Sequence, residues 1–157
     1  MFILKIILLI SFGMIFYQDT KDREVYWYLF PLVWLCVSLL FYFKTITELF
    51  IMALLINLTF ISLLLFVIFL YAKLKLKTNF YHAIGLGDVL FFYAVACSFS
   101  TISFLVIFIC ALIFSLVVHF AMEKETKSVP LAGYMSLFFG LIYIGFWTGL
   151  ISSVYQI

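Results

Sequence analysis

Long apolar runs separated by short polar connections make up most of the chain. Five runs lie at about residues 2–18, 25–43, 49–72, 80–122 and 129–155. Most approach or exceed the roughly 20 residues that a membrane-spanning helix needs. The fourth run is too long for one helix, and its polar cluster from Ser98 to Ser103 predicts a tight turn between helices at about 80–98 and 102–122. The pattern therefore predicts six transmembrane helices in one bundle; a single strongly tilted helix over the fourth run would give an odd number, but helix tilt is limited.

The composition agrees with a membrane protein that contacts the lipid bilayer. Of 157 residues, 68% are hydrophobic and 10% are charged, whereas soluble domains have about a quarter charged residues. An outer-membrane barrel would alternate polar and apolar residues along strands, and no such alternation is present. The first run lacks the small-residue cleavage site of a signal peptide, so we expect a retained first helix. These features predict an all-α integral membrane protein that forms one membrane domain over residues 1–157.

Basic residues are distributed unevenly among the predicted connections. Six spans place three connections on one side of the membrane, at residues 19–24, 73–82 and 123–128. These hold seven basic residues, namely Lys21, Arg23, Lys73, Lys75, Lys77, Lys124 and Lys127, against Lys5 and Lys44 on the other side. The positive-inside rule then puts the three connections in the cytoplasm and both termini outside. We expect a multi-pass protein of the cell (cytoplasmic or inner) membrane. The net charge of +2 and the scattered basic residues argue against nucleic-acid binding.

Two aspartates are expected at the cytoplasmic ends of the bundle. Asp88 stands in the sequence Gly85-Leu86-Gly87-Asp88 and precedes a run from Val89 to Met122 without Asp, Glu, Lys or Arg. Carboxylates at membrane depth are costly and usually functional. Asp19 directly follows the first apolar run, so the predicted topology places both acids at the same membrane face.

Such a pair can hydrolyse a peptide bond without a metal or a covalent nucleophile. One protonated carboxyl group polarises the scissile carbonyl while the other, ionised, takes a proton from water. Gly85 and Gly87 lack a Cβ, so the backbone can turn freely and an extended substrate can approach closely, which predicts a substrate-positioning role. An Asp past a helix end is more often a cap or a solvated residue, and glycines often serve helix packing. The combination of both acids, one face and the flanking glycines favours Asp19 and Asp88 as catalytic residues.

The remaining polar residues predict no further site. Cysteine and histidine spacings do not match a metal site, so we expect neither a metal nor another cofactor. Asn57, in the third span, is expected to bond between helices. Asp22 and Glu24 could attract a basic substrate segment, but Lys21 and Arg23 neutralise them locally, which favours a solvated loop.

Three segments carry a family resemblance. They are Tyr17-Gln18-Asp19-Thr20-Lys21-Asp22-Arg23, Gly85-Leu86-Gly87-Asp88-Val89-Leu90 and Val129-Pro130-Leu131-Ala132-Gly133-Tyr134. Their order and placement resemble the type IV prepilin peptidases and the archaeal preflagellin peptidases, the G-x-G-D membrane aspartic proteases. In that family an Asp ending the first helix pairs with the Asp of the glycine motif, and a Pro-containing stretch starts the last helix. The resemblance covers nearly the whole chain.

The resemblance implies an aspartic endopeptidase with six spans and a cytoplasmic active site. It would remove the short basic leader of prepilin-like membrane proteins, the substrates of type IV pilus and protein secretion systems. The cysteine-rich segment of bifunctional members is missing, so peptidase activity alone is implied. Many members also carry Ile-Pro-Asn after the first Asp and a Lys two residues after the second, where this chain has Leu90.

Two other functions are compatible with the residues. A non-catalytic membrane scaffold or assembly component with the same fold is the main alternative, because the missing Lys fits a protein that has lost substrate-side residues. A proton-coupled transporter would need polar groups continuing toward the outer face, and the spans after Asp88 are too apolar to supply them. The oligomeric state does not follow from the sequence.

Overall fold

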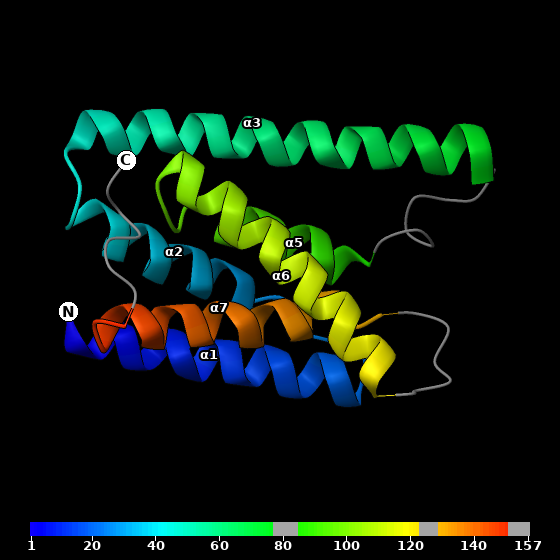
Figure 1. Ribbon diagram of the computed structural model, residues 1–157, viewed down its shortest axis with the longest axis horizontal. Coiled ribbons are helices and arrows are strands. Elements are labelled where there is room, and N and C mark those ends of the chain that lie inside the picture. The colour runs from blue at the N-terminus through cyan, green and yellow to red at the C-terminus, as the bar shows by residue number, and fades with distance from the viewer. Residues whose placement is uncertain (77–84, 123–128, 151–157) are drawn as a thin grey trace.

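The part of the chain described by the computed structural model, residues 1–76, 85–122 and 129–150, is helical and contains no strand (Figure 1). Its elements are α1 (Phe2–Lys21), α2 (Leu29–Tyr42), α3 (Thr47–Tyr71), the π-helical segment η1 (Ala72–Leu76), α5 (Leu86–Val95), α6 (Thr101–Ala121) and α7 (Leu131–Trp147). The prediction of an all-α chain is confirmed over these residues.

Three of these helices are long and apolar enough to cross a membrane. They are α1 with 20 residues, Thr47–Leu74 with 28 residues, and α6 with 21 residues. By contrast, α2, α5 and α7 are apolar but have only 14, 10 and 17 residues. At about 1.5 Å per residue, these three fall short of a hydrocarbon core of about 30 Å. Helix length therefore supports three spans rather than the predicted six.

The helices α2, α5 and α7 are shorter than the predicted spans because they begin later or end earlier than the apolar runs. The predicted second span, 25–43, starts with four residues, Val25–Tyr28, that are not helical. Parts of two other predicted spans, 80–84 and 151–155, lie outside the described residues. Hydropathy alone does not mark a helix end inside an apolar run, since an apolar residue can also lie in a turn.

The outer faces of α3 and α6 are covered with large apolar side chains. More than half of the side-chain surface is exposed at Leu55, Leu63, Val67, Val106 and Phe120. Soluble monomers rarely expose apolar patches of this extent. The exposed faces, together with the three long apolar helices, indicate a membrane protein.

Successive helices run in opposite directions through the bundle (Figure 1). The C-terminal ends of α1, α3 and α6 and the N-terminal ends of α2, α5 and α7 therefore lie at one end of the bundle. The polar cluster that predicts a turn in the fourth apolar run lies around the break between α5 and α6, at the opposite end. The alternating directions bring the ends that carry Asp19 and Asp88 together.

Aromatic rings fill the centre of the bundle between α1, α5 and α7. The ring of Phe12 lies 6.3 Å from Phe91 and 6.4 Å from Phe139, measured between centroids. Phe99, from the turn before α6, stacks on Phe139 at 6.3 Å and contacts Tyr143 at 5.0 Å. All five rings are buried. Because lipid offers no hydrophobic driving force between helices, close packing of this kind holds the helices together.

Asn57 connects α3 to the turn between α5 and α6. Its buried side-chain amide donates hydrogen bonds to the carbonyls of Ala96 at 2.9 Å and Phe99 at 3.2 Å. The prediction that Asn57 bonds between helices is confirmed, with backbone carbonyls as its partners. These two carbonyls lie past the end of α5, so the side chain satisfies backbone acceptors that the helix leaves open.

Replacing Asn57 with Leu is expected to lower the free energy of unfolding by about 1 to 2 kcal/mol, because two buried carbonyls lose their donor. Thermal unfolding in detergent measures the change. Thr59→Val is the matched control on the same helix, since the exposed Thr59 hydroxyl donates only to Leu55 within α3. Equal midpoints for the two variants would contradict a structural role for Asn57.

Candidate active site

Asp19 lies in the last turn of α1, where its side chain is buried against α7. The backbone N–H of Gly133 donates a hydrogen bond of 2.6 Å to the carboxyl oxygen Oδ2. Helix α1 places the acid there because Leu8, Phe12 and Ile15 precede it on the same buried face. The carboxyl group therefore sits at the polar end of the face that packs the core.

Asp88 lies in the first turn of α5 and is half-buried. Its oxygen Oδ1 accepts a hydrogen bond of 2.8 Å from the backbone N–H of Ala132. Ala132 directly precedes Gly133, so the two acids accept from consecutive amides of α7. The charges of Asp19 and Asp88 also interact. The structure thus brings the two predicted residues together.

The N-terminus of α7 is the anchor of this acid pair. The first amides of a helix have no partner inside the helix, and the helix dipole favours negative charge at that end. Ala132 and Gly133 lie in the first turn of α7, after the N-cap residue Pro130. Three helices, α1, α5 and α7, therefore meet at two carboxyl groups.

Gly133 permits the close approach of α1 and α7. A Cβ atom at this position would lie 3.0 Å from both Cβ and Oδ2 of Asp19. Real Cβ atoms rarely have neighbours this near, so a larger residue would push the carboxyl group or the helix away. The sequence places Gly133 next to a helix-starting Pro130, but only the structure reveals its contact with Asp19.

The two glycines of the glycine motif differ in their surroundings. Gly85 is the N-cap of α5 with φ −65° and ψ 145°, a conformation open to any residue. A Cβ at Gly85 would lie 3.2 Å from Oδ2 of Asp88. Gly87 lies within α5, and its Cβ would make an ordinary contact of 3.6 Å with Phe30. Gly85 therefore does not need the backbone freedom of a glycine. A side chain at this position would instead occupy the space beside the Asp88 carboxyl group.

Arg23 is a further residue of the site. It follows the C-cap of α1 and has φ 60°, the left-handed conformation that commonly ends helices and favours glycine. Its charge interacts with both Asp19 and Asp88. The sequence interpretation paired Arg23 with its neighbours Asp22 and Glu24, and it did not predict this long-range effect on the acid pair because the turn geometry was not known.

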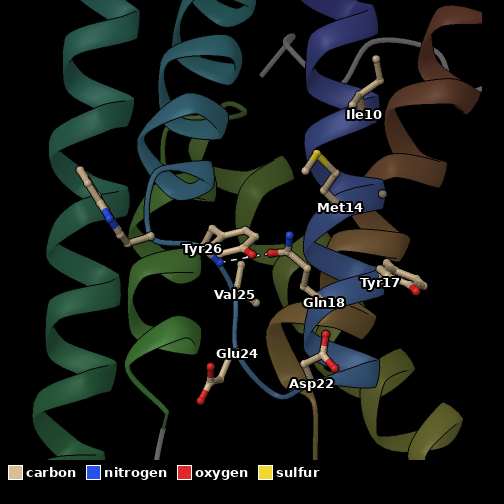
Figure 2. Close-up of a pocket in the computed structure, with 10 residues that line it drawn as sticks. Ile10, Met14, Tyr17, Gln18, Asp22, Glu24, Val25 and Tyr26 are labelled. Carbon is tan, nitrogen blue, oxygen red and sulfur yellow. Dashed lines mark hydrogen bonds between the residues drawn. The ribbon is translucent and has the colours of Figure 1, made fainter.

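A cavity of about 820 Å³ lies on the outer side of α1, next to the connection between α1 and α2 (Figure 2). We call it the α1 groove. Its lining residues are Ile10, Gly13, Met14, Tyr17, Gln18, Asp22, Glu24, Val25, Tyr26 and Trp27. Gln18 precedes Asp19 in the chain, and its side-chain oxygen accepts a hydrogen bond of 3.2 Å from the backbone N–H of Tyr26. The groove therefore borders the helix turn that carries the first acid.

The described residues offer no metal site. No three His, Cys, Asp or Glu side chains among them lie close enough to hold an ion. His82 lies outside the described residues.

Comparisons of the chain with protein-family models, curated proteins and solved structures find no match. The family resemblance therefore rests on the three sequence segments alone, two of which contribute the acids and one the amides that hold them.

Proposed function

We propose that the chain is a membrane-embedded aspartic endopeptidase that removes the short leader of prepilin-like precursors at the cytoplasmic membrane face. The observation that supports it is the pair of carboxyl groups held on consecutive amides of α7. Neighbouring amides in one helical turn point in similar directions, so the acids that accept from them lie side by side. Two adjacent acids can hydrolyse a peptide bond without a metal or a covalent nucleophile.

In the proposed mechanism, the two carboxyl groups share one proton. Two adjacent carboxylates resist ionising together, so one of Asp19 and Asp88 is protonated when a substrate arrives. The protonated group donates to the scissile carbonyl, and the ionised group takes a proton from the attacking water. The tetrahedral intermediate then collapses as a proton passes to the leaving nitrogen. Asp19 keeps Oδ2 on the amide of Gly133 and has Oδ1 for this chemistry, whereas the Asp88 carboxyl group also has a backbone hydrogen bond with Gly85.

The membrane arrangement is part of the same proposal. All six apolar helices cross the cell membrane, and the bilayer thins locally where α2, α5 and α7 are shorter than its hydrocarbon core. The uneven distribution of basic residues puts the acid pair in the cytoplasm and both termini outside. The scissile bond of a precursor anchored in the same membrane then meets the acids at the interface.

Processing of a precursor tests the proposal. The protein is co-expressed with a prepilin-like protein that carries a short basic leader, an apolar helix and a C-terminal tag. The expected result is a tagged product shortened by the leader, with the new N-terminus identified by mass spectrometry. An unprocessed precursor beside folded, membrane-inserted protein would contradict the proposal.

A scaffold is the second candidate function. The hydrogen bonds from α7 to the two acids favour it if they serve only to hold the helices together. Both acids are already satisfied by backbone amides, and these contacts join α1, α5 and α7. A scaffold needs only acceptor oxygens at these positions, whereas a peptidase also needs groups that ionise. Asn at either position therefore separates the two functions.

Replacing Arg23 with Gln is expected to slow leader cleavage about 10-fold, because the positive charge that favours an ionised carboxylate at the site is lost. Rates of cleavage in detergent, measured with a purified precursor, give the effect. Arg23→Lys keeps the charge and is expected to retain most of the activity. Equal rates for the Gln and Lys variants would show that the charge of Arg23 has no part in cleavage.

A further inference from the structure

We infer that the α1 groove is the docking site for the precursor, with the precursor's apolar helix against α1 and its basic leader beside Asp22 and Glu24. The inference rests on the proposed function and names where the substrate of that reaction binds. Its occupant is a membrane helix with basic residues preceding its N-terminus.

The membrane-side half of the groove fits an apolar helix. Ile10, Met14 and Tyr17 lie on one exposed face of α1 at helical spacing, and Gly13 lies between them. A Cβ at Gly13 would meet nothing within 4 Å, so the groove is open at this point. Small residues let a second helix approach closely inside a membrane.

The other half of the groove carries negative charge. Figure 2 shows Asp22 and Glu24 at the end of the groove away from Ile10 and Met14. Both acids are exposed and line the groove, whereas neither Lys21 nor Arg23 does.

The two basic neighbours have other contacts. The Lys21 amine is held 2.9 Å from the Tyr17 hydroxyl, although it still interacts with the charge of Asp22. The charge of Arg23 acts on Asp19 and Asp88. Lys21 offsets part of the charge of Asp22, and Glu24 adds a second negative charge to the lining, so this end of the groove favours basic residues of a substrate.

The order of these features along α1 is the reverse of the order along the proposed substrate. Apolar residues come first in the membrane, Gln18 follows next to the buried Asp19, and the acids Asp22 and Glu24 lie beyond. A precursor lying antiparallel to α1 therefore has its apolar helix, its scissile bond and its basic leader at these same three levels. A second cavity, of about 480 Å³ between α2, α3 and α5, has no charged residue in its lining and lacks this match.

Filling the apolar half of the groove is the first test. Gly13→Trp is expected to lower kcat/KM for the precursor about 10-fold with kcat little changed, because it blocks binding and leaves the acid pair intact. The fold should tolerate it, since open space surrounds Gly13. Ile109→Trp, at an exposed position of α6, is the control and is expected to match the wild type. Equal kcat/KM for both variants would overturn the inference.

Charge reversal tests the acidic half. Glu24→Lys is expected to slow processing of a basic leader about 5- to 10-fold, and a leader with acidic residues in place of its basic ones should recover most of that loss. Glu48→Gln, an exposed acid in the first turn of α3 at the other end of the bundle, should have no effect. Failure of the reversed leader to recover processing would contradict leader binding at Glu24.

A disulfide crosslink separates failure of docking from failure of the peptidase reaction. The tested variant carries Met14→Cys together with Asp88→Asn and Cys110→Ala, which removes the exposed native thiol. It is co-expressed with precursors that each carry a single cysteine along the apolar helix. The expected crosslink yield is at least about 5-fold above that of Val106→Cys, which lies on the exposed face of α6. A crosslink without wild-type cleavage would support docking and contradict the peptidase proposal. Wild-type cleavage with no crosslink, or a crosslink only to a second copy of this chain, would overturn the docking site alone.

Discussion

Asp19→Asn and Asp88→Asn are each expected to reduce leader cleavage by at least about 10³-fold, the scale of a lost acid or base in general acid–base catalysis. An amide neither takes a proton from water nor donates one as a carboxylic acid does. Its carbonyl oxygen can still accept the hydrogen bond from Gly133 or Ala132. The helices therefore stay in place while the chemistry is lost.

The measurement is the fraction of tagged precursor processed over time, together with the thermal midpoint of each purified variant. Glu48→Gln is the control for loss of an acid outside the site. Cleavage by either Asn variant at close to the wild-type rate would end the acid-pair proposal. If the Asn variants support assembly of a pilus-like structure without processing, the scaffold function gains instead.

Gly133→Ala is expected to reduce cleavage about 100-fold and to destabilise the protein by about 1 to 3 kcal/mol, the range for overpacking a tight contact. The new methyl group would lie 3.0 Å from the Cβ and Oδ2 atoms of Asp19. Either the carboxyl group leaves the amide or α7 moves away from α1, and both changes separate the acids. Cleavage rate and thermal midpoint are measured together.

Gly140→Ala on the same helix is the matched control. A Cβ there would lie 4.0 Å from atoms of Phe12, an ordinary distance, and Ala favours a helix over Gly. Wild-type cleavage and an unchanged or higher midpoint are expected. If Gly133→Ala behaves like Gly140→Ala, the close approach at Asp19 is not needed for activity.

The helices could be located from the sequence, but their lengths could not. Long apolar runs predict α1, α3 and α6 well, because each run continues without interruption for a membrane thickness. The second span was predicted from residue 25, whereas α2 begins at Leu29; Pro31, which favours the first turn of a helix, marks this start, but hydropathy does not use it. Turns formed by apolar residues leave no signal in hydropathy.

The sequence predicts that the two acids of the candidate site lie at one end of the bundle, but it does not predict the backbone amides that donate hydrogen bonds to them. The number of apolar runs between Asp19 and Asp88, together with the uneven distribution of basic residues, predicts that both acids lie at one end of the bundle. The alternating directions of the helices in the structure also place them there. The amides of Ala132 and Gly133 carry no side-chain signal, because every residue has a backbone N–H. The electrostatic role of Arg23 and the exposed acids of the α1 groove depend on the path of the connection after α1, which local sequence does not determine.

The hydrogen bonds to α7 also bear on how the protein is made. Asp19 and Gly133 are 114 residues apart in sequence, and Asp88 and Ala132 are 44 residues apart. During synthesis, α1 and α5 enter the membrane before the helix that satisfies their carboxyl groups exists. The two acids therefore lack these hydrogen bonds until α7 is made. On the proposed function, a nascent chain therefore lacks the complete acid site until its last helix is made, so its own apolar helices enter the bilayer before the site can cleave them.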